Sequence, residues 1–126
     1  MDEKERFNAG MKIRREVLGD RHVDKANQNT DAFTADFQDL LTRYAWGEIW
    51  ARPGLPRPTR SLLTIAILVS LNRQDELRMH LRAALANGIS QDEIREVLLQ
   101  CALYCGLPAA NAAFHTAQEL LQEARE

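Results

Sequence analysis

His80 is the residue of this chain best suited to proton transfer, and it lies in the segment NRQDELRMHLRAALA. Its imidazole has a pKa near neutrality, so it can take up or release a proton under physiological conditions. Arg73, Glu76 and Arg82 are close to it in sequence. Two interpretations stay open: a general acid or base, or a helix-surface or interface histidine that bonds to a carboxylate.

Three arginines, Arg52, Arg57 and Arg60, flank the proline-rich stretch RPGLPRPTR. Guanidinium groups suit planar carboxylates, and a proline-rich loop holds them at a small entropic cost. The alternative is a solvated loop whose arginines pair with Glu48 or with the first helix, and we favour it for Arg52 and Arg57. Arg60 opens an apolar helix, where an unpaired charge would be costly, so it is the stronger candidate.

Glu48 lies between Trp46 and Trp50 in the segment WGEIW. A carboxyl group among aromatic rings is poorly solvated, which raises its pKa and allows it to act as an acid. An exposed glutamate at a helix end is an equally good interpretation of the same residues.

Cys101 and Cys105 are four residues apart, so they share one face of a helix. Their CxxxC spacing differs from the CxxC of thiol oxidoreductases and fits a helix-internal disulfide poorly. Zinc would need further ligands, and none is suitably spaced. We therefore interpret the thiols as small apolar side chains. Tyr104 precedes the break at Gly106 and Pro108, where a pocket wall could form.

The composition is that of an ordinary globular domain, with 126 residues, a net charge of −2, 45% hydrophobic and 27% charged residues. This length predicts one domain over residues 1–126. The charge gives no reason to expect nucleic acid or a membrane surface, and the longest apolar run, Leu62 to Leu71, is too short to span a bilayer. The charged N-terminus lacks a signal-peptide core, and two cysteines do not make a disulfide scaffold. We expect a cytoplasmic protein.

The sequence predicts that the elements positioning these residues are all helices. Valine and isoleucine are sparse, and in no segment do apolar and polar residues alternate with period two. We expect an all-α fold of about six helices, with a loop at the prolines and a short turn at residues 22–26. Ser90 and Glu93 form a capping box at the start of one helix. The expected helices are Glu3–Leu18, Asp31–Trp46, Thr59–Leu71, Gln74–Ala86, Gln91–Cys105 and Ala109–Ala124.

The helix expected at Thr59–Leu71 has almost continuous apolar residues. That pattern predicts burial almost all round the helix. A buried helix in so small a chain predicts an oligomer that covers apolar surface left open by the monomer.

Four segments together resemble the carboxymuconolactone decarboxylase family, part of a wider alkylhydroperoxidase D-like superfamily. They are GMKIRREVLGDRHVDKA, LTRYAWGEIWARPGLPRPTRSLLTIA, LRMHLRAALANGISQDEIREVLLQ and ALYCGLPAANAAFH. The resemblance covers nearly the whole chain. It implies a single-domain, all-α helical bundle that assembles into a homo-oligomer, a ring-like hexamer built from dimers.

The chain departs from the peroxidases of that superfamily at the redox motif. Those proteins carry CxxC followed by a histidine four positions after the second cysteine. Counted back from His80, the cysteine positions hold Arg73 and Glu76. Because Cys101 and Cys105 lie on a different helix, the sequence argues against thiol-peroxidase activity.

The resemblance implies decarboxylation of 4-carboxymuconolactone to 3-oxoadipate enol-lactone in the protocatechuate branch of the β-ketoadipate pathway. This dicarboxylate lactone carries its own electron sink, since the electrons left by CO2 spread to the lactone carbonyl oxygen. We therefore expect no PLP, thiamine or metal cofactor. The protein must bind the retained carboxylate, stabilise the dienolate-like oxygen and deliver a proton to the ring.

Residue chemistry suggests a part for each candidate. Arg60 would bind the carboxylate or the oxyanion, His80 would deliver the proton, and Glu48 would orient or re-protonate His80. Arg52 or Arg57 would help to hold the acid. Pocket-lining positions are assigned to Tyr104 and Cys105.

Two alternatives stay open. One is a related lyase of the same fold that acts on another lactone or keto-acid. The other is a non-catalytic helical oligomer that binds a small acid or a partner protein.

Overall fold

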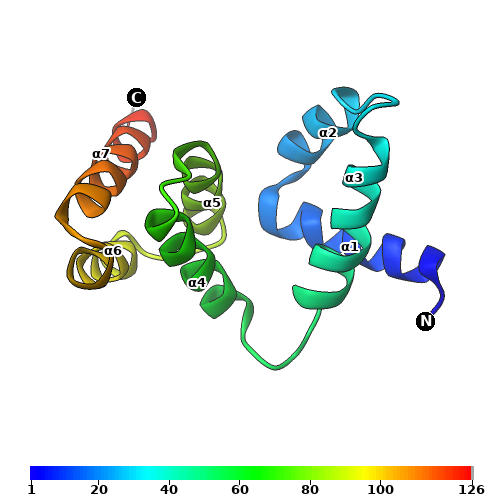
Figure 1. Cartoon of the computed structure of the whole chain (residues 1–126), viewed down its shortest axis with the longest axis horizontal. Coiled ribbons are helices and arrows are strands. Elements are labelled where there is room, and N and C mark those ends of the chain that lie inside the picture. Colours follow the sequence, from blue (N-terminus) through cyan, green and yellow to red (C-terminus); the bar gives the residue numbers. More distant parts are fainter. Residues whose placement is uncertain (126) are drawn as a thin grey trace. The chain divides into compact units, whose positions relative to one another are not determined.

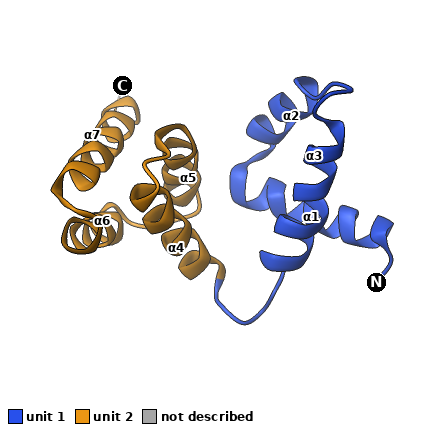
Figure 2. Ribbon diagram, viewed as in Figure 1, with its two compact units in different colours: residues 1–56 blue, residues 57–126 orange. Residues whose placement is uncertain are grey.

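The computed structural model describes residues 1–125, and over this range the chain is helical, with no β-strand. It divides into two compact units, residues 1–56 and residues 57–126 (Figures 1 and 2). The all-α class is confirmed, with seven α-helices and one π-helix in place of about six helices. The single domain over residues 1–126 stays a prediction.

The first unit contains α1 (Glu3–Leu18), α2 (Asp20–Gln28), α3 (Ala35–Leu40) and the π-helix η1 (Leu41–Ile49). Helix α1 has the bounds that the sequence predicted. It starts with a capping box, in which the Asp2 carboxylate accepts from the Glu5 amide at 2.8 Å and the Glu5 side chain accepts from the Asp2 amide. It ends at Gly19, whose φ of 90° favours glycine.

Two sequence predictions for this unit were wrong. The expected turn at residues 22–26 lies inside α2, where Val23 is fully buried. The helix expected from Asp31 starts only at Ala35, because the Asp31 carboxylate accepts from the amides of Phe33 and Thr34 and makes a turn there. Helix α3 is followed directly by η1, in which the backbone hydrogen bonds join residues five positions apart. At its end, for example, the Trp50 amide donates to the Ala45 carbonyl at 2.9 Å.

Helix α1 packs against η1 through two glycines. A Cβ at Gly10 would lie 1.9 Å from the carbonyl oxygen of Thr42, and a Cβ at Gly47 would lie 2.5 Å from the carbonyl oxygen of Arg6. Both distances are far below van der Waals contact, so only glycine allows the two backbones to approach this closely. Beside this contact, the buried Arg14 guanidinium donates to Thr42 Oγ1 at 3.4 Å.

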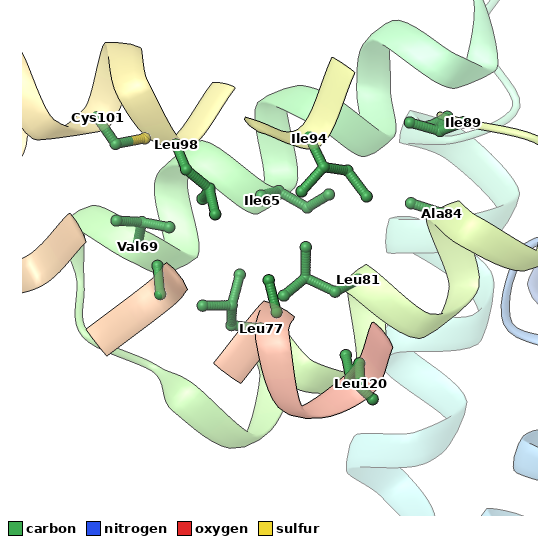
Figure 3. Packing of buried hydrophobic residues seen from close by; sticks show 12 residues of the cluster. Ile65, Val69, Leu77, Leu81, Ala84, Ile89, Ile94, Leu98, Cys101 and Leu120 are labelled. Atoms are coloured by element: carbon green, nitrogen blue, oxygen red, sulfur yellow. The ribbon is translucent and has the colours of Figure 1, made fainter. Parts of the chain in front are cut away.

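The second unit is a bundle of four helices, α4 (Arg57–Ser70), α5 (Gln74–Ala86), α6 (Gln91–Cys105) and α7 (Leu107–Glu123). The predicted bounds of α5 and α6 are confirmed, as is the capping box of Ser90 and Glu93. The bundle closes around one apolar core (Figure 3). Its buried members are Ile65, Val69, Leu77, Leu81, Ala84, Ile89, Ile94, Leu98, Cys101, Ala113, Ala117 and Leu120.

The prediction that the helix expected at Thr59–Leu71 is buried almost all round was wrong for α4 within this chain. Ile65 and Val69 are fully buried, whereas Leu63, Ile67 and Leu71 are 47%, 54% and 63% exposed. The exposed positions repeat every four residues, so they form one apolar stripe along the helix. Elsewhere in the second unit, Leu99, Leu103 and Leu107 are also exposed. Within the described residues, no helix is long and apolar enough to cross a membrane.

Candidate active site

Glu48 is the acidic candidate of the first unit, and it lies in the last turn of η1. Its Oε2 accepts a hydrogen bond from Arg6 Nη1 at 2.5 Å, and its Oε1 lies 3.5 Å from Arg52 Nη1. The carboxylate is therefore paired with two guanidinium groups. Its side chain is 43% exposed. It is therefore neither a carboxyl group enclosed by aromatic rings nor a fully exposed glutamate at a helix end, the two interpretations that the sequence left open.

The tryptophans on either side of Glu48 stack on each other. The ring centroids of Trp46 and Trp50 are 4.9 Å apart at an interplanar angle of 26°. The Glu48 carboxylate pairs with the guanidinium groups of Arg6 and Arg52. The alternative that an arginine of the loop pairs with Glu48 is thus confirmed for Arg52.

Arg6 is a residue of this site that the sequence interpretation missed. It is 42 residues away from Glu48, and neither residue belongs to a motif that would connect them. Its guanidinium also lies 3.4 Å from Glu3 Oε1 and 5.3 Å from the centre of the Tyr44 ring. The hydrogen bond to Glu48 raises the pKa of Arg6 above its ordinary value, so its positive charge is permanent.

Glu3 holds this cluster together from the first turn of α1. Its Oε2 accepts from Arg43 Nη1 at 2.8 Å and from the Tyr44 hydroxyl at 2.9 Å. These bonds, first that from Arg43, lower the pKa of the Glu3 carboxyl below its usual range. The carboxylate is therefore ionised at neutral pH, and it ties α1 to η1 beside Arg6.

The basic candidates of the second unit lie at the start of α4. Arg57 is the first residue of the helix and is exposed, whereas Arg60 is half-buried one turn later. Helix α4 begins at Arg57 because Pro58 fits the first turn, where no backbone N–H is needed. Pro58 is therefore part of the helix, although the sequence suggested that it belongs to the loop.

His80 is buried on the inner side of α5, with 9% of its surface exposed. Leu77 and Leu81, which belong to the core, lie on the same helix. Glu76 comes one turn earlier, and its carboxylate accepts from Arg73 Nη2 at 3.1 Å. That bond is the main cause of the lowered pKa of Glu76, with a smaller contribution from the charge of His80. Burial excludes the interpretation of His80 as a helix-surface residue within this chain.

Tyr104 and Cys105 lie at the end of α6. Tyr104 is 78% exposed, whereas Cys105 is half-buried and packs against the core. Both cysteines are free thiols, which agrees with their interpretation as small apolar side chains. Burial, and then the neighbouring Cys105, raises the pKa of Cys101 to about 11.

A groove of about 460 Å³ lies between α5, α6 and α7 of the second unit, but the candidate residues named above do not line it. Its polar lining includes Arg95, Asn111, His115, Gln118 and Arg125. Among the described residues, no group of three His, Cys, Asp or Glu side chains is arranged to hold a metal ion.

Comparison with known proteins gives a consistent result. The model of the carboxymuconolactone decarboxylase family matches residues 35–119. A 4-carboxymuconolactone decarboxylase of Acinetobacter baylyi is 53% identical over 98% of this chain and 92% of its own length. Nitrosuccinic acid decarboxylase npaB of Metarhizium robertsii is 41% identical over 93% of this chain and 82% of its own length.

Proposed function

This chain belongs to the carboxymuconolactone decarboxylase family, and on that premise we propose that it decarboxylates 4-carboxymuconolactone to 3-oxoadipate enol-lactone and CO2 in protocatechuate catabolism. The observation that carries the proposal is the 53% identity to a 4-carboxymuconolactone decarboxylase over 98% of the chain.

The proposed reaction needs no external electron acceptor. The bond between the ring carbon and its carboxylate breaks, CO2 leaves, and the electron pair moves through the ring double bond to the lactone carbonyl oxygen. A proton then adds to the ring carbon next to that carbonyl. The protein accelerates this sequence by stabilising the charge that develops on the oxygen and by placing the proton donor.

In the second unit, His80 and Arg60 are suited to these two tasks. His80 is 9% exposed, so its imidazole is largely shielded from bulk water, which suits a proton donor to a carbanion-like centre. Arg60 supplies a permanent positive charge for the retained carboxylate or the oxyanion. Its half-buried position gives that charge more effect than an exposed arginine would have.

The other assignments are predictions from residue chemistry. Glu48 would orient or re-protonate the proton donor, and Arg52 or Arg57 would help to hold the acid. Tyr104 and Cys105 would line the substrate pocket. Tyr104 is exposed in this chain, so its assignment requires that another surface covers it.

An assembly of several copies is part of the proposal. The stripe formed by Leu63 and Ile67 on α4 and by Leu71 directly after it is apolar and largely exposed. Burying such a stripe against a second copy is favourable by about 25 cal/mol per Å². We expect a hexamer built from dimers. Sedimentation of the purified protein as a stable monomer would contradict this part.

The proposed reaction is tested by the product formed in buffered D2O. Proton NMR should show the enol-lactone with one deuterium on the ring carbon next to the carbonyl, at a rate far above the reaction without protein. Recovery of unchanged lactone from folded protein would overturn the proposal.

A second candidate function is decarboxylation of another small acid by the same residues. The 41% identity to a nitrosuccinic acid decarboxylase favours it, because a nitro group can also accept the electron pair that CO2 leaves behind. Comparison of kcat/KM for the lactone and for nitrosuccinate distinguishes the two functions. Binding of either acid without turnover would instead favour a non-catalytic small-acid-binding oligomer.

A further inference from the structure

We propose that Arg6 is a positioning residue for the Glu48 carboxylate. This inference rests on the proposed function, because it takes Glu48 to participate in the decarboxylation. All the contacts that carry it lie within the first unit, between α1, η1 and Arg52 in the loop that follows η1.

The two oxygens of the Glu48 carboxylate have different partners. Oε2 accepts a short hydrogen bond of 2.5 Å from Arg6, whereas Oε1 lies 3.5 Å from the exposed guanidinium of Arg52. A charge-assisted bond as short as the first is the stronger of the two and fixes the plane of the carboxylate. Oε1 is held more loosely, and it is the oxygen left to act on another group.

Arg6 is itself held in place, as a positioning residue must be. Its side chain is only 19% exposed, Glu3 accepts from its Nε at 3.4 Å, and the Tyr44 ring lies below its guanidinium at 5.3 Å. Glu3 is in turn fixed by Tyr44 and Arg43. An ion pair on an open surface would lack these further contacts, which hold the arginine itself in place.

The backbone contact also sets the distance between Arg6 and Glu48. Gly47, the residue before Glu48, lies so close to α1 that a Cβ there would be 2.5 Å from the Arg6 carbonyl oxygen. The backbone positions from which the Arg6 and Glu48 side chains extend are therefore fixed with respect to each other. The π-helical hydrogen bonds of η1 set the direction in which Glu48 leaves the helix, and such π-helical turns are frequent at functional sites.

The test compares kcat and KM for the lactone in wild type, Arg6→Ala, Arg6→Lys and the control Arg15→Ala. Arg15 is a matched control because it lies on α1 and pairs with Asp20 and Asp24, away from Glu48. Arg6→Ala should lower kcat about 10- to 100-fold with little change in KM, because misplacing a group that acts in the transition state costs about this much. Arg6→Lys should recover part of the loss, and Arg15→Ala should match wild type.

A double-mutant cycle separates positioning from a merely structural contribution. In a Glu48→Gln background, Arg6→Ala should cause almost no further loss of kcat, because the group on which Arg6 acts has already been removed. Equal losses in both backgrounds would show that Arg6 acts independently of Glu48 and would overturn the inference.

The outcomes for the inference and for the proposed function differ. An inactive but folded wild type refutes the proposed function, and this inference with it. An active wild type with an unchanged, folded Arg6→Ala variant refutes the inference alone. If Arg6→Ala does not fold, the cycle with the milder Arg6→Lys decides, and a loss of kcat that persists unchanged in the Glu48→Gln background would contradict the inference.

Discussion

At the residue scale, the chain combines a buried histidine with charged side chains whose partners are defined. His80 is 9% exposed in the second unit, and Glu48 is held by Arg6 in the first. The sequence proposes His80, Arg60 and Glu48 because few residue types perform proton transfer and carboxylate binding, and their roles in the reaction stay predictions. Arg6 could not be selected, because its role depends on a contact across 42 residues that only the packing of α1 on η1 creates.

Replacement of His80 tests the assigned proton donor. His80→Ala should lower kcat for the lactone about 10²- to 10⁴-fold, the usual loss when a positioned acid or base is removed. His115→Ala is the control, because His115 is exposed and pairs only with Glu119 among the described residues. Steady-state kinetics on folded protein provide the comparison, and a near-normal kcat for His80→Ala would refute the assignment.

The buried Cys101 thiol should react little in the native protein. Since the pKa of Cys101 is raised to about 11, its thiol stays protonated at pH 8 and gains reactivity only as the pH rises toward that value. Iodoacetamide labelling followed by mass spectrometry should show slow modification of Cys101 in the folded protein and fast modification in urea. Fast labelling of the folded protein at pH 8 would show that the raised pKa is wrong.

At the element scale, the close contact of α1 with η1 determines the shape of the first unit. The sequence predicted the bounds of α1, α5 and α6 because capping residues and periodic apolar positions mark them locally. It did not predict η1, because π-helical bonding has no local sequence signature, and the close approach of Gly10 on α1 to Gly47 on η1 joins residues far apart in the chain. The turn at Asp31 was missed because its carboxylate caps a turn and not the helix.

The glycine contact predicts a large loss of stability on a small substitution. Gly10→Ala should destabilise the protein by about 1–3 kcal/mol, because its Cβ would lie 1.9 Å from the Thr42 carbonyl oxygen and the backbones must separate. Gly54→Ala is the control, since no heavy atom would lie within 4 Å of its Cβ. Urea unfolding measures both, and equal midpoints for the two variants would contradict the structural account of this contact.

At the scale of the whole molecule, the exposed apolar side chains favour assembly. The sequence indicated an oligomer from the continuous apolar pattern of α4, although burial within one chain covers only part of that helix. The surface that covers the remaining stripe cannot be identified from one chain, because in the proposed assembly that surface belongs to another copy.

A charge on this stripe should weaken the assembly. Ile67 is 54% exposed, so Ile67→Lys should be tolerated by the folded chain but should shift sedimentation toward smaller species. Ala86→Lys, at an exposed position at the end of α5, should sediment as wild type does. An unchanged sedimentation coefficient for Ile67→Lys at low protein concentration would exclude the stripe as an interface.

Release of CO2 from 4-carboxymuconolactone by the purified chain alone is the reaction on which every residue assignment depends. The most direct measurement follows ultraviolet absorbance and evolved CO2 after purified protein is mixed with freshly generated lactone, with and without a chelator. We expect rapid loss of the lactone, with one CO2 released per molecule, at the same rate in both samples. Folded, oligomeric protein that leaves the lactone intact would contradict it.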